Sequence, residues 1–354
     1  MENVLEVSKL RTYFHMHDHL VRAVDGVDFT VKKGEVLGIV GESGCGKSIT
    51  SLSIMRLVPS PPGKIETGKI LFKGENLLDA SIERMRKIRG NDVSMIFQEP
   101  MTSLNPVFTV GFQIGEVLKL HRGMEKKEAV DECARLLDLV GISEPRERVF
   151  EYPFQLSGGL RQRVMIAMAM ACEPSILIAD EPTTALDVTI QAQILRLMRE
   201  LKEKTDSSIM FITHDLAVIA SFTDRVMVMY AGVVVESAPV KQIFAKPLHP
   251  YTQGLLSSIP VLGDMKRSAE GKRMLLRTIP GTLPDPRNFP KGCRFAPRCP
   301  QVMPKCHEAE PALVDMGNNQ QVRCYLHSDE ERKDTYEPKE VKDKKKKKKR
   351  SAAK

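Results

Sequence analysis

The stretch GESGCGKS, residues 41–48, restricts the fold more than any other part of this 354-residue chain. It has the spacing G-x-x-x-x-G-K-S, it follows the apolar run EVLGIV (35–40), and TSLSIMRLV, with helical spacing, follows it. Glycines let a backbone curl so that successive N–H groups point at phosphates, and the start of a helix adds positive potential. We therefore predict a strand, a phosphate-binding loop and a helix at this place.

The side chains of the loop suit a nucleoside triphosphate with its magnesium ion. Lys47 is expected to bind the β- and γ-phosphates of ATP, and the hydroxyl of Ser48 to bind Mg²⁺. Cys45 is interpreted as a small residue of the loop, or as a thiol whose pKa is lowered at a helix N-terminus. The predicted ATP-binding residues of this stretch are Gly41, Glu42, Ser43, Gly44, Cys45, Gly46, Lys47, Ser48 and Ile49.

Strand and helix patterns alternate along the chain. Residues 1–40 alternate apolar and polar positions and predict an antiparallel β region, whereas 110–142 carry helical spacing. The runs SILIAD (175–180) and SSIMFITHD (207–215) predict buried strands on either side of a long helix at 189–204. Strands that alternate with helices form mostly parallel sheets with helices on the faces, so the predicted class is α/β.

Two carboxylates end the predicted strand ILIAD. Asp180 stands at the strand end, where it can hold Mg²⁺ through water, and Glu181 follows it. Glu181 can polarise an attacking water as a general base. Together with the phosphate-binding loop upstream, this pair indicates a nucleotide-hydrolysing site.

The composition changes toward the C-terminus. Proline becomes more frequent from Lys246 onward, which predicts a boundary near 240–260. We expect an ATPase domain at 1–250 and a small irregular C-terminal domain at 251–330. After residue 330, twelve Lys or Arg stand against five Asp or Glu, so most of the net charge of +8 lies in a tail at 331–354 that is expected to be disordered.

The location of the charge limits the partners. Without its tail the chain is close to neutral, so no basic face for nucleic acid is expected. The tail KDKKKKKKRSAAK is interpreted as a solubilising extension or as a segment attracted to anionic lipid headgroups. No apolar run approaches the roughly 18 residues that span a bilayer, and MENVLEVSKL does not have the pattern of a secretory signal. We therefore expect a cytoplasmic protein.

A second anion-binding stretch lies between the two motifs. In QLSGGLRQR, Ser157, Gly158 and Gly159 precede the helical run RVMIAMAMAC, so their N–H groups would face a ligand. The phosphate-binding loop, LSGG and ILIADEP in this order resemble the nucleotide-binding subunits of ATP-binding cassette (ABC) transporters. The resemblance implies that LSGG closes on the ATP of a second ABC ATPase subunit in a dimer. Leu160 belongs to this signature, although the family most often has Gln there.

The resemblance assigns roles to further positions. Gln98 in MIFQEP matches a residue that touches Mg²⁺ and water, Asp187 in TTALD one that crosses the dimer interface, and His214 in FITHD one that contacts the γ-phosphate. An aromatic residue of RTYFH is expected to stack on adenine, with Phe14 preferred to Tyr13. The implied catalytic residues are Glu181, His214 and Gln98, and the implied magnesium ligands are Ser48, Gln98 and Asp180.

Narrower features resemble the oligopeptide/dipeptide importer branch, which also includes nickel and some sugar importers. These features are QEPMTSLNP (98–106), DVTIQAQI (187–194), PLHPYTQ (247–253) and the cysteine segment. The implied fold is a P-loop NTPase of ABC type, with a mostly parallel sheet core, an antiparallel β subdomain and a helical subdomain at about 100–170. The 101–150 segment would dock on transmembrane permease subunits at the cytoplasmic face of the membrane, with an extracytoplasmic substrate-binding protein as an indirect partner.

Four of the seven cysteines lie close together in the C-terminal region: Cys293, Cys299, Cys306 and Cys324. Structural disulfides are not expected in a reducing cytoplasm, whereas four thiolates could hold Zn²⁺ or a [4Fe–4S] cluster. Zinc sites usually contain C-x2-C pairs, which these cysteines do not form, so the wider spacing suits the larger cluster. The family resemblance also favours a [4Fe–4S] cluster. Zinc and unligated thiols are the alternatives.

We predict that the chain is the ATP-hydrolysing subunit that powers an ABC importer for di- or oligopeptides. The alternatives are the same role in an importer of nickel or sugars, or a soluble ABC-type switch ATPase. Soluble ABC proteins of translation or DNA repair usually carry two cassettes or a long coiled-coil insertion, and this chain has neither. A regulatory iron–sulfur module that only binds nucleotide would show a damaged catalytic set, and the set here is intact.

Overall fold

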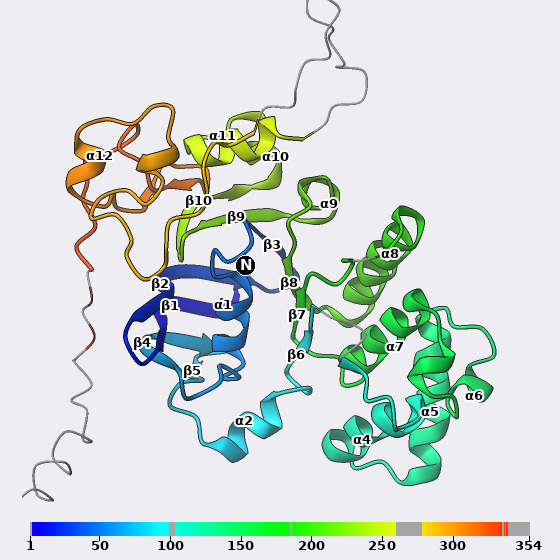
Figure 1. Cartoon of the computed structure of the whole chain (residues 1–354). Coiled ribbons are helices and arrows are strands. Elements are labelled where there is room, and N and C mark those ends of the chain that lie inside the picture. The colour runs from blue at the N-terminus through cyan, green and yellow to red at the C-terminus, as the bar shows by residue number, and fades with distance from the viewer. Residues whose placement is uncertain are drawn as a thin grey trace, which may run out of the picture.

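The computed structural model describes residues 2–98, 103–184, 186–259 and 278–334, together with 336 and 338. Figure 1 shows a small antiparallel sheet beside a larger sheet, with a group of helices on the far side of the larger sheet. The small sheet has the order β2-β1-β4-β5. Its strands are β1 (Asn3–His15), β2 (Leu20–Lys32), β4 (Gly63–Phe72) and β5 (Glu75–Asn76).

The larger sheet has eight strands in the order β11-β12-β10-β9-β3-β8-β7-β6. The five from β9 to β6 are parallel, and β10 and β12 extend the sheet in antiparallel fashion. This confirms the predicted parallel core; of the antiparallel β region predicted at 1–40, β1 and β2 are antiparallel, whereas β3 belongs to the parallel core. The strands are β3 (Val36–Val40), β6 (Val93–Ile96), β7 (Ile176–Asp180), β8 (Ser208–Ile212), β9 (Arg225–Tyr230), β10 (Val233–Pro239), β11 (Val314–Asp315) and β12 (Gln321–Val322).

The central strands are mostly apolar because both faces of the larger sheet are covered, and their buried polar residues include Asp180 at the end of β7 and Ser208 at the start of β8. In β7, Leu177 and Ala179 pack into the core shared with the helices, whereas Ile176 and Ile178 pack into the core shared with the small sheet. Alternating residues of a strand point to opposite faces, so a strand buried on both sides reads as a nearly continuous apolar run. The short apolar runs of the sequence therefore mark the middle of the molecule.

Helix boundaries follow the local capping signals. Thr109 begins α4 by accepting the N–H of Phe112, and Gly123, in the left-handed region, ends it before α5. The predicted helical region 110–142 is therefore two helices. The α-helices are α1 (Lys47–Ile54), α2 (Ile82–Ile88), α4 (Val110–Arg122), α5 (Lys126–Leu139), α6 (Pro145–Arg148), α7 (Gly158–Met170), α8 (Val188–Thr205), α9 (Leu216–Phe222), α10 (Val240–Ala245), α11 (Pro250–Ser257) and α12 (Lys305–Glu308). Two short 3-10 helices are η1 (Pro153–Gln155) and η2 (Ala296–Arg298). None of the helices described has the length and apolar content required to cross a membrane.

The described part of the C-terminal region, residues 278–334, forms a lobe beside β10 and α11 (Figure 1). Val322 of β12 pairs with Glu236 of β10, so the lobe continues the larger sheet. Phe295 packs edge-on against both Tyr230 and Tyr251. The separate core of the lobe is small, which means that contacts with the rest of the chain hold it in place. The lysine run of the predicted tail lies outside the described residues.

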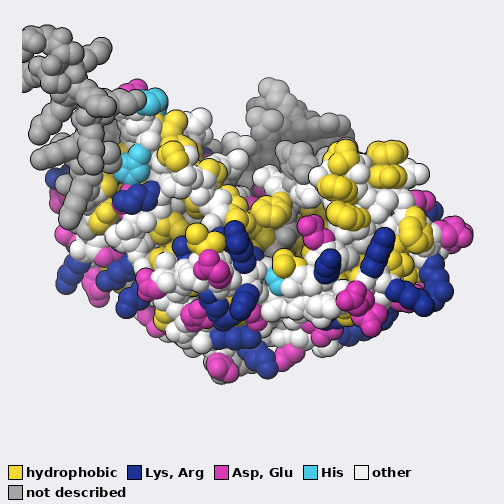
Figure 2. All heavy atoms as spheres, turned by 90° about the horizontal axis from the view of Figure 1, so that it is seen from below, with side chains coloured by type: hydrophobic (Ala, Val, Ile, Leu, Met, Phe, Trp, Pro, Cys, Tyr) yellow, Lys and Arg dark blue, Asp and Glu magenta, His cyan; other side chains and the backbone are white. Residues whose placement is uncertain are grey.

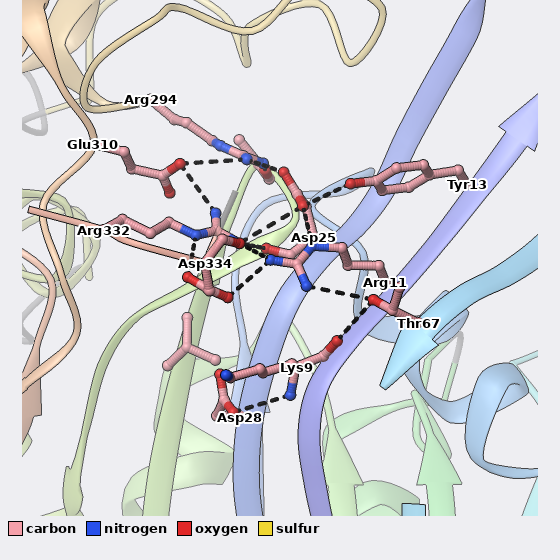
Figure 3. Close-up of polar contacts among 12 residues, drawn as sticks. Lys9, Arg11, Tyr13, Asp25, Asp28, Thr67, Arg294, Glu310, Arg332 and Asp334 are labelled. Carbon is pink, nitrogen blue, oxygen red and sulfur yellow. Dashed lines mark hydrogen bonds and ion pairs between the residues drawn. The ribbon is translucent and has the colours of Figure 1, made fainter. Parts of the chain in front are cut away.

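A buried ionic network ties this lobe to the small sheet (Figure 3). Asp25 on β2 lies at its centre, where Arg11 Nε donates over 3.1 Å and the hydroxyl of Tyr13 over 2.7 Å. Arg294 and Arg332 reach Asp25 from the C-terminal lobe, the latter donating to its backbone oxygen over 2.8 Å. The side chain of Asp25 is 9% exposed, so these charges compensate one another with little help from water.

The pKa of Asp25 gives the network a pH dependence. Burial alone would raise this pKa, but Arg294 and Arg332 hold it well below its usual range. A depressed pKa contributes stability above about pH 4, the value in the unfolded chain, and that contribution disappears as the pH falls further.

We expect Asp25→Asn to lower the free energy of unfolding by about 2 kcal/mol at pH 7, because three arginines lose a buried negative partner. The difference from the wild type should shrink at pH values below about 4. Denaturant unfolding at several pH values measures both effects. Asp28→Asn, on the same strand but exposed, is the matched control and should change stability by less than about 0.5 kcal/mol. Equal effects of the two substitutions would contradict the role given to Asp25.

Candidate functional site

The loop at 41–48 turns tightly between β3 and α1, and two glycines make this turn sterically possible. Gly41 and Gly46 have φ values of 154° and 106°, and a Cβ atom on either would lie 2.2 or 2.4 Å from a backbone oxygen of Met229 or Ala23. No side chain fits at these positions, so the loop can keep its backbone close to a ligand. This backbone is consistent with the predicted phosphate-binding loop, and the binding itself stays a prediction.

Lys47 is buried at the base of this loop. Its Nζ donates to the carbonyl oxygens of Gly41 over 2.8 Å and Glu42 over 3.1 Å. An ammonium group has three donors, so these two bonds orient the group, and the third contact, to the weakly accepting Cys45 Sγ over 3.9 Å, leaves capacity for a phosphate. Cys45 is fully buried and burial raises the pKa of its thiol, which makes the reactive-thiol interpretation wrong.

Three residues predicted from distant motifs meet at the carboxyl edge of the parallel sheet. Gln98 follows β6, Glu181 follows β7 and His214 follows β8. Because β3, β6, β7 and β8 run parallel, their carboxyl ends share one edge, where the phosphate-binding loop also begins. Motifs that lie far apart in the sequence therefore come close together in space.

Glu181 accepts hydrogen bonds from each of its neighbours. Gln98 Nε2 lies 3.0 Å from Oε2, Thr184 Oγ1 3.0 Å from Oε2, and His214 Nδ1 3.2 Å from Oε1. Burial alone would raise the pKa of Glu181, but the bonds from His214 and Thr184 outweigh it and lower this pKa. The carboxylate is therefore ionised at neutral pH and held in one orientation, as a general base requires.

Asp180 is buried next to Glu181, and its Oδ1 has no hydrogen-bond partner in the described part of the chain. Burial raises its pKa, and a hydrogen bond with Ser48 acts in the opposite direction. A buried carboxylate oxygen without a partner, beside a hydroxyl group, is the type of oxygen site that Mg²⁺ prefers. The residues therefore fit the predicted ion. Gln98 bonds to Glu181 through its nitrogen, so its amide oxygen is not used in that bond.

The two aromatic residues of RTYFH differ in their surroundings. Tyr13 is fully buried and bonds to Asp25, which excludes it from stacking on a nucleotide. Phe14 is half-buried. Thr12, two positions earlier on the same strand, bonds to Ser53 of α1 over 2.7 Å, and alternation turns Phe14 toward that face too. The preference for Phe14 is consistent with this arrangement, and the stacking itself stays a prediction.

The LSGG signature lies at the start of α7, in the group of helices on the far side of the larger sheet (Figure 1). Ser157 caps α7 by accepting the N–H of Leu160 over 3.4 Å, while Gly158 is exposed and a Cβ there would meet open space. Asp187 caps α8 and is also exposed. No described residue of the loop at 41–48 is bonded to these positions, so their predicted role toward a second subunit stays a prediction.

The four C-terminal cysteines lie in one neighbourhood and are free thiols. The N–H of Cys293 donates to the carbonyl of Cys306 over 2.8 Å. Burial, with smaller contributions from the other three thiols, raises the pKa of Cys293 to about 12. Within the described ranges, however, no group of three or more His, Cys, Asp or Glu side chains is arranged to hold a metal ion. A metal cluster is therefore not supported by the present geometry.

Three contacts of the site were not predicted from the sequence. Thr184 holds Glu181, and its position three residues after the predicted general base could have suggested this. Tyr251 and Arg298 both bind Glu42 of the phosphate-binding loop. No local sequence pattern predicts these two contacts, because Tyr251 and Arg298 lie more than 200 positions from Glu42.

Comparisons with known proteins agree with this geometry. The sequence model of the ABC transporter family matches residues 24–184, and that of the oligopeptide/dipeptide transporter C-terminal region matches 235–306. The chain is 54% identical to the oligopeptide transport ATP-binding protein AppD of Bacillus subtilis, covering 93% of this chain and 98% of that protein. It is 53% identical to the dipeptide transport ATP-binding protein DppD of the same organism, over 92% and 95% of the two chains. The ATP-binding cassette MJ0796, solved as a dimer bound to ADP and Pi, superposes with a TM-score of 0.60 at 28% identity, over 67% of this chain and 98% of that one.

Proposed function

The chain belongs to the ABC transporter ATP-binding subunits of the oligopeptide/dipeptide family, and from this premise we propose that it hydrolyses ATP to drive peptide import at the cytoplasmic face of a membrane. The relatives are named for oligopeptide and dipeptide transport, which does not favour nickel or sugars as the cargo. The observation that carries the proposal is the convergence of Gln98, Thr184 and His214 on Glu181, beside the phosphate-binding loop.

The residues of this site divide the chemistry among them. Lys47 and the N–H groups of the loop bind the phosphates, which fixes the terminal phosphate at the sheet edge. Glu181 accepts a proton from the attacking water, and Gln98 and His214 keep its carboxylate oriented for that step. Ser48, Asp180 and Gln98 would hold Mg²⁺, which supplies neutralisation of phosphate charge when bound. Each role follows from whether the side chain is an ionised acceptor, as Glu181 is, or a donor, as Lys47, Gln98 and His214 are.

Two exposed features support a second ATPase subunit as a partner. Ser157 and Gly158 present the N-terminus of α7 to solvent, and Asp187 is exposed at the start of α8. Free N–H groups at a helix start are suited to phosphate oxygens. We propose that they meet the ATP of the second subunit, whether that subunit is a copy of this chain or a related ATPase.

A groove of about 380 Å³ beside β6 supports docking of the permease subunits. It lies between β6, α4, α7 and the segment that follows α1, and we call it the α4 groove; its apolar lining includes Leu57, Met95, Phe97, Val117, Leu120 and Met168. Figure 2 views the molecule from the side of α2 and α4, and hydrophobic side chains are exposed across this face. Phe97 stands directly before Gln98, so a permease helix in the groove would act next to the catalytic glutamine.

We expect Leu120→Glu to reduce co-purification with the permease subunits at least about tenfold, because the side chain is 71% exposed in the groove and a charge there opposes apolar contact. The ATPase activity of the isolated subunit should stay unchanged. Ile82→Glu, on an apolar residue 61% exposed outside the groove, is the matched control. Normal assembly of the Leu120→Glu variant would argue against the α4 groove as the docking site.

ATP-dependent uptake of labelled di- and oligopeptides by the reconstituted importer tests the transport function. Mass spectrometry of the ligand on the co-purified binding protein identifies the cargo. Uptake of nickel or a sugar in place of peptides would overturn the proposed cargo while leaving the ATPase assignment intact.

We keep the [4Fe–4S] cluster of Cys293, Cys299, Cys306 and Cys324 as a separate proposal, with Zn²⁺ as the alternative. Its support is that four thiols share one neighbourhood in a lobe with a small core. Binding would require the side chains to turn toward one another. Anaerobic purification decides it, since a cluster gives bound iron and a broad absorbance near about 400 nm.

A further inference from the structure

The C-terminal lobe reaches the phosphate-binding loop directly. Arg298, the last residue of η2, forms a two-pronged ion pair with the Glu42 carboxylate, with N–O distances of 2.8 and 3.0 Å. Tyr251 accepts the N–H of Glu42 through its hydroxyl over 2.9 Å. The Cβ position of Gly44 faces Leu283 of the same lobe at 3.9 Å. The loop is therefore held by the lobe as well as by β3 and α1.

Each polar group of Glu42 is engaged in these contacts. Its carboxylate binds Arg298, its N–H donates to Tyr251, and its carbonyl oxygen accepts from Lys47. The carbonyl that orients the Lys47 ammonium thus belongs to a residue whose side chain is fixed by Arg298. A displacement of Glu42 would move one of the two oxygens that hold Lys47 in place.

Glu42 also presents an electrostatic problem for ATP binding. It is a carboxylate within a loop built to bind phosphates, and like charges repel. Its side chain is 28% exposed, so water screens it only in part. Arg298, with a side chain only 6% exposed, neutralises this charge in the bidentate geometry that an arginine forms best.

Arg298 is itself fixed from several sides. Its Nε donates to the carbonyl of Pro280 over 2.8 Å, and its guanidinium lies 5.8 Å from the ring centre of Tyr230. A buried guanidinium held in this way stays in one position at little further entropy cost. The geometry supports a fixed anchor for Glu42.

We propose that Arg298 is a positioning residue for ATP binding: it acts through Glu42, by holding the backbone that orients Lys47 and by neutralising the one carboxylate of the phosphate-binding loop. The C-terminal lobe then contributes to the nucleotide affinity of the cassette. This inference rests on the proposed ATPase function.

A double-mutant cycle on the full-length chain tests the inference, with KM for ATP, kcat and Tm measured for each variant. Arg298→Gln should raise KM for ATP about tenfold with kcat changed less than about twofold, because binding is lost equally in ground and transition states. Glu42→Gln should raise KM less than about threefold. In the double variant, KM should return close to the Glu42→Gln value, since the unpaired carboxylate is gone.

The control and the contrary outcomes separate positioning from general stability. Arg332→Gln removes an equally buried arginine of the same lobe that does not touch the loop, and it should lower Tm while leaving KM for ATP unchanged. If Arg298→Gln does not fold, Tyr251→Phe removes only the hydroxyl that accepts from Glu42 and should raise KM about threefold.

An unchanged KM in Arg298→Gln, or in Tyr251→Phe where that variant replaces it, would overturn the inference. A KM loss of the same size with and without Glu42→Gln would also overturn it. In both cases the wild type still hydrolyses ATP, so the proposed function stands. A wild-type chain that neither binds nor hydrolyses ATP would instead overturn the proposed function, and the inference with it.

Discussion

Replacement of Glu181 by glutamine is expected to lower ATP turnover at least about a hundredfold while ATP binding persists. Glutamine keeps the oxygen that accepts the hydrogen bonds of Gln98 and Thr184, so the site should keep its shape. It cannot accept the proton of the attacking water. With ATP bound and not hydrolysed, the dimer with the second ATPase subunit should accumulate in its closed state.

Three measurements check this prediction: the rate of phosphate release, the affinity for ATP, and the fraction of dimer by size-exclusion chromatography with ATP and Mg²⁺. Glu203→Gln, on an exposed glutamate of α8, is the control and should behave as the wild type. Unchanged turnover in Glu181→Gln would refute the general-base role. Loss of ATP binding would mean that the substitution disturbs the structure of the site.

Lys47→Ala is expected to act one step earlier, by reducing ATP affinity at least about a hundredfold. The ammonium is buried and already oriented by the carbonyl oxygens of Gly41 and Glu42, so its charge is only weakly screened by water. Alanine removes the one lysine of the phosphate-binding loop and leaves these two oxygens without their donor. The closed dimer should not form even at high ATP concentration.

Titration with a fluorescent ATP analogue measures the affinity, and thermal unfolding checks that the variant is folded. Lys33→Ala is the control, because this lysine lies at the surface in an exposed pair with Asp206. An affinity within about threefold of the wild type would contradict the role of Lys47. Compared with each other, the two substitutions separate ATP binding from ATP hydrolysis, because both should stop turnover but only Lys47→Ala should prevent binding.

Much of the candidate site follows from the sequence because its parts are short and local. The glycines of 41–48 specify a loop that admits no side chain, as the contacts at Gly41 and Gly46 confirm. Gln98, Glu181 and His214 each follow an apolar run, and parallel strands bring such positions to one edge. Their convergence was predictable because strand direction alone decides it.

Other features could not be predicted because they depend on pairs that are distant in sequence. Tyr13 could have been assigned to adenine, and only its bond to the buried Asp25 shows that it serves the fold. Cys45 could have been a reactive thiol, and only its complete burial excludes this. Thr184 is a partial case, because its spacing from Glu181 is local while its hydrogen bond depends on the turn after β7.

The C-terminal lobe shows most clearly which features depend on the sequence alone and which depend on the tertiary structure. By itself the sequence determined the glycine-rich loop at 41–48, the pair of carboxylates at the end of β7, the α/β alternation and the family, since each depends on residue types at fixed short spacings. The tertiary structure alone decided that β12 joins the ATPase sheet, that Arg294 and Arg332 close on Asp25, and that Arg298 holds Glu42. The physical reason is that a buried charge requires a partner, and folding selects that partner from the whole chain.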